Sequence, residues 1–139
     1  MLRYNTHDLT RIYYGKCECG RTTPRMEKVT GRADDMLIIR GVNVFPTQIE
    51  AVMLAYSQVE PHYTIHVDRV NNLDRMTVKV EMTPSFFSDS IKEIESIERK
   101  LAEEIASVTG VHARIMLCEP RSLPRSEGKI KRVYDERFK

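Results

Sequence analysis

One lysine stands where its charge could serve chemistry at a phosphate. Lys129 follows a glycine in the polar segment 124–132, which also contains one proline and two arginines. A long cationic side chain on such a loop can be delivered to a negatively charged reaction centre, where a positioned ammonium stabilises developing charge without proton transfer. Lys131 is the neighbour from which it must be distinguished. Taken alone, this short string is better explained as part of a solvated basic tail.

Two segments together resemble a known family. Residues 31–46 read Gly-Arg-Ala-Asp-Asp-Met-Leu-Ile-Ile-Arg-Gly-Val-Asn-Val-Phe-Pro and resemble the hinge segment of the acyl-adenylate-forming enzymes. Residues 124–132 resemble the catalytic-lysine loop of the same enzymes, and the order and separation of the two segments fit that family. The run 34–46, followed by Gln-Ile-Glu at 48–50, is similar to the phenylacetate-coenzyme A ligases in particular. The resemblance covers nearly the whole chain and implies the mobile C-terminal domain of a larger ligase.

The resemblance assigns mechanistic roles to Lys129 and Asp34. In the family, the lysine at this motif position contacts the acyl carboxylate and the α-phosphate. The residue at the position of Asp34 is the hinge about which the C-terminal domain turns between adenylate formation and thioester formation. A small polar residue on an unpaired segment can absorb such backbone changes. The register of the motif favours Asp34 over Asp35, and an ordinary turn aspartate is the alternative interpretation.

The resemblance also places two residues at the ribose of ATP. Arg32 matches the family arginine that approaches the ribose hydroxyls, and Asp8 resembles the aspartate that accepts hydrogen bonds from both of them. A carboxylate suits this role because it can accept from two adjacent hydroxyls at once. The motif around Asp8 departs from the family pattern, with Asn5 in place of the usual arginine and His7 where many relatives carry glycine. An unspecialised surface aspartate therefore stays open as the alternative.

A third set of residues is implied at coenzyme A. In relatives, the loop that matches Arg40, Gly41, Val42 and Asn43 turns toward the active site for the thioester step and lines the pantetheine tunnel. A glycine lets a thiol-bearing chain pass close to the backbone. A plain hairpin glycine explains Gly41 equally well on local sequence, and the two roles are compatible.

The cysteines give no firm metal site. Cys17 and Cys19 could supply two of the four ligands of a tetrahedral zinc ion, but a spacing of one residue is shorter than usual. Cys118 lies in a predicted strand. Free thiols are the favoured interpretation, and a zinc site completed by residues from another domain stays open.

The elements that must position these residues begin with a hairpin and a helix. The β-branched stretch 36–45 is interrupted by Arg-Gly, which predicts two short strands around a tight turn. Pro46 can start a helix that ends near Ser57, with Thr47 and Glu50 as a capping box. Apolar residues at helical spacing predict a second helix over residues 90–110, with a continuous apolar stripe from Ile91 to Val108.

Three further stretches have the pattern of strands. Residues 64–68 and 76–82 alternate apolar with polar side chains, as expected of an antiparallel pair that buries one face, and residues 112–118 form a third strand. A polar loop then leads to a short basic terminal helix. The predicted fold is a two-layer α+β domain with a small, mainly antiparallel, three-stranded sheet, two packed helices, an N-terminal β-hairpin and a short C-terminal helix.

Composition limits the function classes. The chain has 139 residues, is 41% hydrophobic and 30% charged, and carries a net charge of only +2, which argues against a dedicated nucleic-acid-binding protein. From residue 121 onward there are seven Lys and Arg against three Asp and Glu, so the end of the chain is a candidate anion-facing surface. No apolar run approaches the roughly 18 residues that span a bilayer. Three cysteines make no disulfide framework, and we expect a cytoplasmic protein.

The expected organisation has two parts. Residues 1–30 are read as the end of an N-terminal adenylation domain, and residues 31–139 as the mobile C-terminal domain of an acyl-coenzyme A ligase. The implied reaction uses ATP with Mg²⁺, an aryl carboxylate such as phenylacetate, and coenzyme A. Most of the ATP and acid sites lie in the family's N-terminal domain, so we expect this chain to be inactive alone. The alternative is a free-standing accessory module that binds a separate adenylating subunit.

Overall fold

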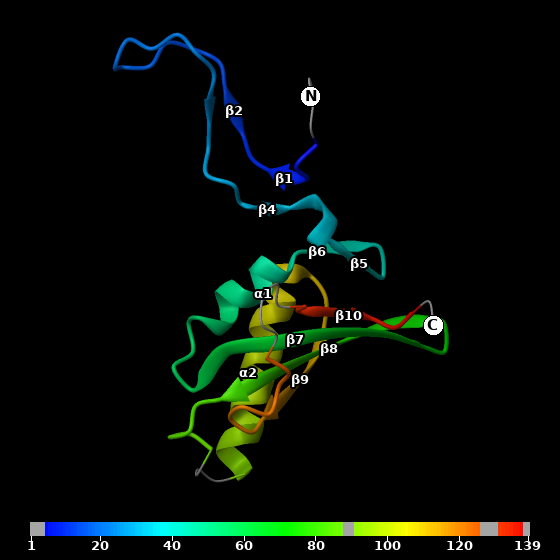
Figure 1. Ribbon diagram of the computed structural model, residues 1–139. Helices are drawn as coiled ribbons and strands as arrows, with labels where there is room; N and C mark the ends of the chain where they lie inside the picture. The colour runs from blue at the N-terminus through cyan, green and yellow to red at the C-terminus, as the bar shows by residue number, and fades with distance from the viewer. Residues whose placement is uncertain (1–4, 88–90, 126–130, 138–139) are drawn as a thin grey trace. The chain divides into compact units, whose positions relative to one another are not determined.

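The computed structural model describes residues 5–87, 91–125 and 131–137, with the side chain of Asp34 excepted (Figure 1). The chain divides into two compact units, Met1–Met36 and Leu37–Lys139. The fold of each unit follows from a different kind of interaction.

The first unit is built from two-residue strands. Strand β1 (Asp8–Leu9) pairs antiparallel with β4 (Gly31–Arg32), β2 (Ile12–Tyr13) pairs antiparallel with β3 (Arg25–Met26), and the 3-10 helix η1 (Ala33–Asp35) follows β4. The ladders are extended by side-chain bonds such as that from the Thr10 hydroxyl to the Glu27 carbonyl at 2.7 Å. None of the described side chains of residues 5–36 is buried. Hydrogen bonds rather than an apolar core therefore hold this unit's local structure.

The second unit is organised by a four-stranded mixed sheet in the order β10-β7-β8-β9. Strands β7 (Val59–Val70) and β8 (Leu73–Met82) are antiparallel, while β9 (Ala113–Cys118) runs parallel to β8 and β10 (Val133–Asp135) runs parallel to β7. The predicted two-layer α+β class is confirmed, and the β7–β8 pair is antiparallel as expected. The prediction that the sheet has three strands and is mainly antiparallel is wrong: a fourth strand, β10, joins it, and two of its three pairings are parallel. The crossover through α2 brings β9 back parallel to β8, as helical crossovers do.

The predicted C-terminal helix is wrong for residues 133–135. The edge of β7 offers unpaired main-chain groups there, and the amide of Ile65 donates to the carbonyl of Arg132 at 2.7 Å. Val133 also packs against the core, which a strand position allows. A short segment gains more from these ladder bonds than from an isolated helical turn, whose nucleation is unfavourable.

Helix α1 (Pro46–Met53) follows the hairpin directly. It begins at Pro46 as predicted but ends before Ser57, and the predicted capping box of Thr47 and Glu50 is wrong. Since Phe45 is the N-cap residue, Gln48 occupies the third helical position, and its side-chain oxygen accepts the Phe45 N–H at 3.0 Å. The Glu50 carboxylate is thereby left for another partner.

Helix α2 (Ile91–Thr109) is the longest helix, and it lies along the sheet (Figure 1). The predicted stripe is buried only in its middle, at Ile97, Leu101 and Ile105, while Ile91 and Val108 are exposed. The helix ends where predicted, because Gly110 adopts a φ of 76°.

One apolar core joins the helices to the sheet. Alternate residues of the central strands point to the same face, and this face carries the side chains that α1 and α2 cover. The core includes Tyr63, Ile65, Val67, Val78, Val80, Ile115, Ile49, Val52, Leu101 and Ile105. The opposite face is more polar, and there the rings of His66 and Tyr134 stack at a centroid separation of 4.9 Å.

The predicted hairpin is confirmed. Strands β5 (Leu37–Ile39) and β6 (Val42–Val44) pair antiparallel, and the two residues between them, Arg40 and Gly41, have φ values of 50° and 79°. Two successive positive φ values match the right-handed twist of the flanking strands. Glycine takes this conformation without steric cost, which explains its position in the turn.

Candidate functional site

The two residues predicted at the ATP ribose are brought side by side. Asp8 in β1 and Arg32 in β4 are direct partners in an antiparallel ladder. Directly opposed residues of such a pair project from the same face. The neighbouring bond from the Ala33 N–H to the His7 carbonyl, at 2.6 Å, extends the pairing. The ladder therefore brings a carboxylate and a guanidinium to one face, where two adjacent hydroxyls could meet both.

The predicted hinge residue lies at a junction. The backbone of Asp34 is the middle residue of η1, between the ladder residue Arg32 and the hairpin, and its side chain lies outside the described part of the structure. The boundary between the two compact units falls after Met36. A rotation within this short segment would change the placement of one unit against the other.

The predicted coenzyme A loop is the turn of the β5–β6 hairpin. Arg40, Gly41 and Asn43 are exposed, whereas the Val42 side chain is half-buried against the core. Among the described residues, no heavy atom lies within 4 Å of the place that a Cβ would take on Gly41, apart from its chain neighbours. The turn thus has open space beside its glycine, and its conformation rather than crowding restricts the residue type.

Lys129 lies outside the described residues, but the chain on both sides of it is anchored. Before it, Arg125 forms an ion pair with Glu81 of β8 at 2.7 Å. After it, Arg132 forms an ion pair with Glu50 of α1 at 2.8 Å. The segment that carries Lys129 therefore begins and ends at fixed points on the second unit.

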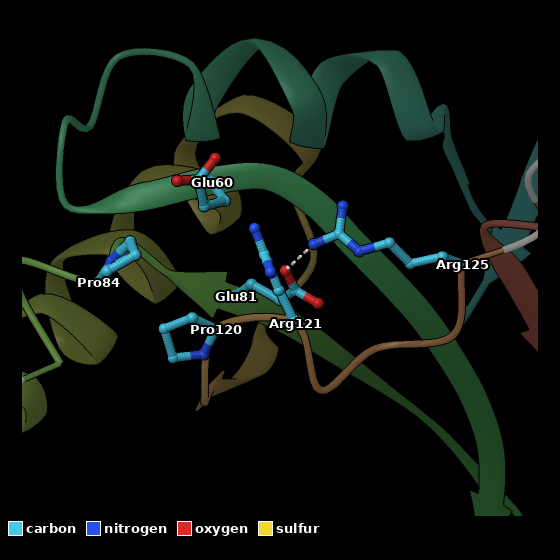
Figure 2. A pocket seen from close by; sticks show the side chains of 6 residues that line it. All are labelled: Glu60, Glu81, Pro84, Pro120, Arg121 and Arg125. Atoms are coloured by element: carbon cyan, nitrogen blue, oxygen red, sulfur yellow. Dashed lines mark hydrogen bonds and ion pairs between the residues drawn. The ribbon is translucent and has the colours of Figure 1, made fainter.

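The first anchor is built around a buried carboxylate. The Glu81 side chain is only 1% exposed, and it accepts the Leu123 N–H at 2.9 Å as well as the Arg125 guanidinium. Figure 2 shows Arg125 reaching Glu81 from the segment that follows β9. The pair borders a hollow of about 250 Å³, which is lined by Glu60, Glu81, Pro84, Pro120, Arg121 and Arg125.

The second anchor includes a tyrosine. The Arg132 guanidinium donates to Glu50 at 2.8 Å and to the Tyr63 hydroxyl at 3.3 Å, and it lies over the Tyr63 ring at 4.9 Å. Burial raises the pKa of Tyr63 to about 12, with the Glu50 charge acting in the same direction. The hydroxyl therefore stays protonated at neutral pH and donates to the Pro46 carbonyl at 3.3 Å.

The cysteine pair lies at the tip of the β2–β3 hairpin. Cys17 and Cys19 are free thiols, and hydrogen bonding with Cys19 lowers the pKa of Cys17. Cys118 lies in β9, and burial raises its pKa. Within the described residues, no group of three or more His, Cys, Asp or Glu side chains could hold a metal ion. A zinc site that used Cys17 and Cys19 would need ligands from outside these residues.

Sequence reasoning missed the two anchors. The partners of each ion pair are far apart in the chain, Glu81 with Arg125 and Glu50 with Arg132, and no local pattern links them. Glu81 itself gives no local signal, because it takes a polar position in the alternation of residues 76–82, where an exposed carboxylate is expected, yet the structure buries it. Such a buried charge requires a partner, which the sequence does not identify.

The fold and these motifs define a domain of an adenylate-forming enzyme. Residues 41–137 match the family described as the AMP-binding enzyme C-terminal domain, and the chain belongs to that family. Among the described residues, no helix has the length and apolarity needed to cross a membrane.

The chain is similar in sequence and structure to several coenzyme A ligases. The chain is 46% identical to the phenylacetate-coenzyme A ligase of Thermus thermophilus, over 99% of this chain but only 34% of that protein. A solved domain of phenylacetate-coenzyme A ligase from Bacteroides vulgatus is 33% identical, with a TM-score of 0.69, over 75% of this chain and 94% of the other. A 2-hydroxyisobutyryl-CoA ligase in its postadenylation state is 32% identical, with a TM-score of 0.82, over 99% of this chain and 29% of that one. The chain thus spans about a third of the length of its full-length relatives.

Proposed function

We propose that this chain supplies the C-terminal part of an ATP-dependent, AMP-forming aryl-acid coenzyme A ligase, with phenylacetate as the acid. The observation that carries the proposal is the 46% identity to a phenylacetate-coenzyme A ligase over 99% of the chain. That similarity includes both compact units. It therefore includes the β1–β4 ladder with Asp8 and Arg32, called the ribose ladder below, as well as the hinge segment and the lysine segment. Residues 1–30 would end the adenylation domain, and residues 31–139 would form the mobile domain.

The first reaction step activates the acid. A carboxylate oxygen attacks the α-phosphorus of ATP, the bond to pyrophosphate breaks, and an acyl-adenylate forms. Negative charge develops on the phosphoryl oxygens, and Lys129 stabilises it as a positioned ammonium. Mg²⁺ would accompany the phosphates of ATP. The anchors at Arg125 and Arg132 support this role because they fix both ends of the segment that carries the lysine.

The ribose ladder orients the nucleotide in this proposal. Asp8 accepts hydrogen bonds from the two ribose hydroxyls, and Arg32 approaches the same hydroxyls from the opposite strand. Their direct pairing in the β1–β4 ladder supports the assignment. A carboxylate that accepts two hydrogen bonds gives stronger interactions than a neutral acceptor would.

The second step transfers the acyl group to coenzyme A. The thiolate of coenzyme A attacks the acyl carbon, and the bond from that carbon to the phosphate oxygen breaks. AMP leaves with the electron pair of the broken bond. The domain turns at Asp34 between the steps and brings the turn formed by Arg40, Gly41, Val42 and Asn43 to the pantetheine arm. The open space beside Gly41 supports a close approach of that arm to the backbone.

The first unit supports the presence of a covering domain. It exposes apolar side chains, namely Leu9, Ile12, Tyr13, Tyr14, Met26 and Val29. Isolated two-stranded ladders are marginally stable in water and need a further surface to pack on. We assign that surface to the N-terminal adenylation domain, which also carries the acid pocket. The chain alone is then inactive.

Reconstitution tests the proposal. The chain is mixed with a separately expressed N-terminal adenylation domain, ATP, Mg²⁺, phenylacetate and coenzyme A, and pyrophosphate, AMP and thioester are followed. Lys129→Ala is expected to abolish pyrophosphate release but to leave thioester formation from preformed phenylacetyl-adenylate, because the lysine serves only the first step. Lys131→Ala is the matched control and is expected to retain the first step.

Two results would contradict the proposal. A folded pair that forms neither adenylate nor thioester would favour an accessory module that binds an adenylating subunit without completing it. Equal pyrophosphate release by Lys129→Ala and the unchanged chain would remove the lysine from the mechanism. Activity with a short aliphatic acid but not with phenylacetate would correct the substrate alone.

A further inference from the structure

One carboxylate lies where three parts of the second unit meet. Asp74 stands at the start of β8, beside the β7–β8 turn, and its side chain is only 10% exposed. One of its oxygens accepts from Arg69 at 2.8 Å, and the other accepts from Arg137 at 3.0 Å. Arg137 follows β10, so the carboxylate links the β7–β8 turn to the end of the described chain.

The same aspartate holds the turn of the β5–β6 hairpin. The Arg40 side chain donates from Nε to the Asp74 carbonyl at 2.7 Å, and the Arg40 N–H points to the Asp74 carboxylate at 3.4 Å. Arg137 adds a second connection, because its Nη1 donates to the Ile38 carbonyl in β5 at 2.6 Å. Both a strand and the turn of the hairpin are therefore tied to one residue.

The two central side chains of the network, Asp74 and Arg137, are charged and largely shielded from water. The Arg137 side chain is 10% exposed and also forms an ion pair with Asp135 at 2.6 Å. Hydrogen bonds to Asp135 and Asp74 raise the pKa of Arg137, and bonding to Arg69 lowers the pKa of Asp74. Both partners therefore stay charged at any pH at which the enzyme would work, and the tie is permanent rather than switchable.

We propose that Asp74 and Arg137 are positioning residues for the thioester-forming step, because they fix the Arg40–Gly41 turn that meets the pantetheine arm. This inference rests on the proposed function and adds two residues to it. Neither residue touches coenzyme A in this assignment; each acts through the turn. The turn has no buried side chain of its own, since Arg40 and Gly41 are exposed, so these hydrogen bonds add to the β5–β6 ladder by tying the turn itself to the sheet.

The adenylation step separates this role from a general structural one. Substitution of a residue that only supports the fold would slow both half-reactions alike. Displacement of the Arg40–Gly41 turn would instead slow thioester formation, the half-reaction that uses the turn. Small displacements of positioning groups can cost up to about 100-fold in rate. We expect a loss of about tenfold or more in the second half-reaction, with adenylation changed by less than about twofold.

The experiment uses the complete ligase or the reconstituted pair. Asp74→Asn and Arg137→Lys are compared in pyrophosphate release from ATP and phenylacetate, and in coenzyme A consumption with preformed phenylacetyl-adenylate. Arg137→Lys keeps the charge but replaces three donor nitrogens by one, so it cannot reproduce the four hydrogen bonds of the guanidinium to Asp135, Asp74 and Ile38. Asp68→Asn is the matched control, because Asp68 lies on the adjacent strand and its side-chain hydrogen bonds among the described residues go to Arg75 on an exposed surface.

Hydrogen exchange gives a readout independent of activity. Amides of residues 40–44 are expected to exchange faster in Asp74→Asn and Arg137→Lys, and at the unchanged rate in Asp68→Asn. Equal losses in both half-reactions, or an unchanged second half-reaction, would overturn the positioning role while leaving the proposed function intact. An unsubstituted enzyme that forms adenylate but no thioester would overturn the proposed ligase function, and the inference with it.

Discussion

Removing Arg125 tests whether the carboxylate of Glu81 is truly desolvated. The Glu81 side chain is 1% exposed, and without Arg125 the Leu123 N–H would be the one remaining donor among its bonds described here. Breaking a buried ion pair by removing one partner costs about 3–5 kcal/mol, because an uncompensated charge is left behind. The Arg125 side chain is 48% exposed, so water can enter the vacated place, and we reduce the expected cost to about 2 kcal/mol.

The distinctive expectation is a rescue by a second substitution. Adding Glu81→Gln to Arg125→Ala removes the unpaired charge but keeps an acceptor for the Leu123 N–H. The double variant is therefore expected to recover about 1 kcal/mol of the loss. Arg75→Ala is the control, because its partner Asp68 lies on the exposed surface, and such pairs contribute about 0.2–1 kcal/mol.

Urea unfolding of the chain measures these differences, provided that the slope against urea concentration does not change. Two outcomes would refute the reasoning. One is a loss for Arg125→Ala no larger than that for Arg75→Ala. The other is a double variant less stable than Arg125→Ala, which would mean that the Glu81 carboxylate is well solvated without its arginine.

Two further predictions concern the core of the second unit. Burial raises the pKa of Tyr63 to about 12, above the value of about 10 for an exposed tyrosine, so the folded state holds this proton more tightly than the unfolded chain does. This proton's contribution to the free energy of unfolding is complete below pH 10, and roughly 2–3 kcal/mol is lost as the pH rises toward 12. Tyr63→Phe should abolish this part of the pH dependence of unfolding. Leu101→Ala should lower the free energy of unfolding by about 2–5 kcal/mol through loss of buried contacts. Val108 is half exposed on the same helix, so Val108→Ala should lower it by less than about 0.5 kcal/mol. Thermal or urea unfolding measures both, and similar losses at the two positions would contradict the burial of Leu101 in α2.

The local sequence pattern was sufficient to predict an element where its residue types suit one backbone geometry. Arg40 and Gly41 predicted the hairpin because two positive φ values are required between its strands, and the structure has them. Ile97, Leu101 and Ile105 predicted a helix with one buried face for the same kind of reason. Pattern failed at residues 133–135, because their ladder partners lie in β7, a strand that begins at Val59 and is far away in the sequence.

In the candidate site too, local motifs predicted some residues, and only the structure showed others. The sequence identified Lys129, Asp34 and Arg32 through motifs whose residues are neighbours in the chain, and these roles stay predictions. It gave no sign that Arg125 and Arg132 anchor the segment around Lys129, since their partners come from β8 and α1.

By itself, then, the sequence determined the local elements and the family of this chain, because spacing, turn residues and motifs act over a few positions. The tertiary structure alone decided which charges meet. Glu81 receives Arg125, Glu50 receives Arg132, and Asp74 collects groups from three separate segments. Ion pairs of this kind depend on how strands and helices pack, and a linear pattern carries no record of that packing.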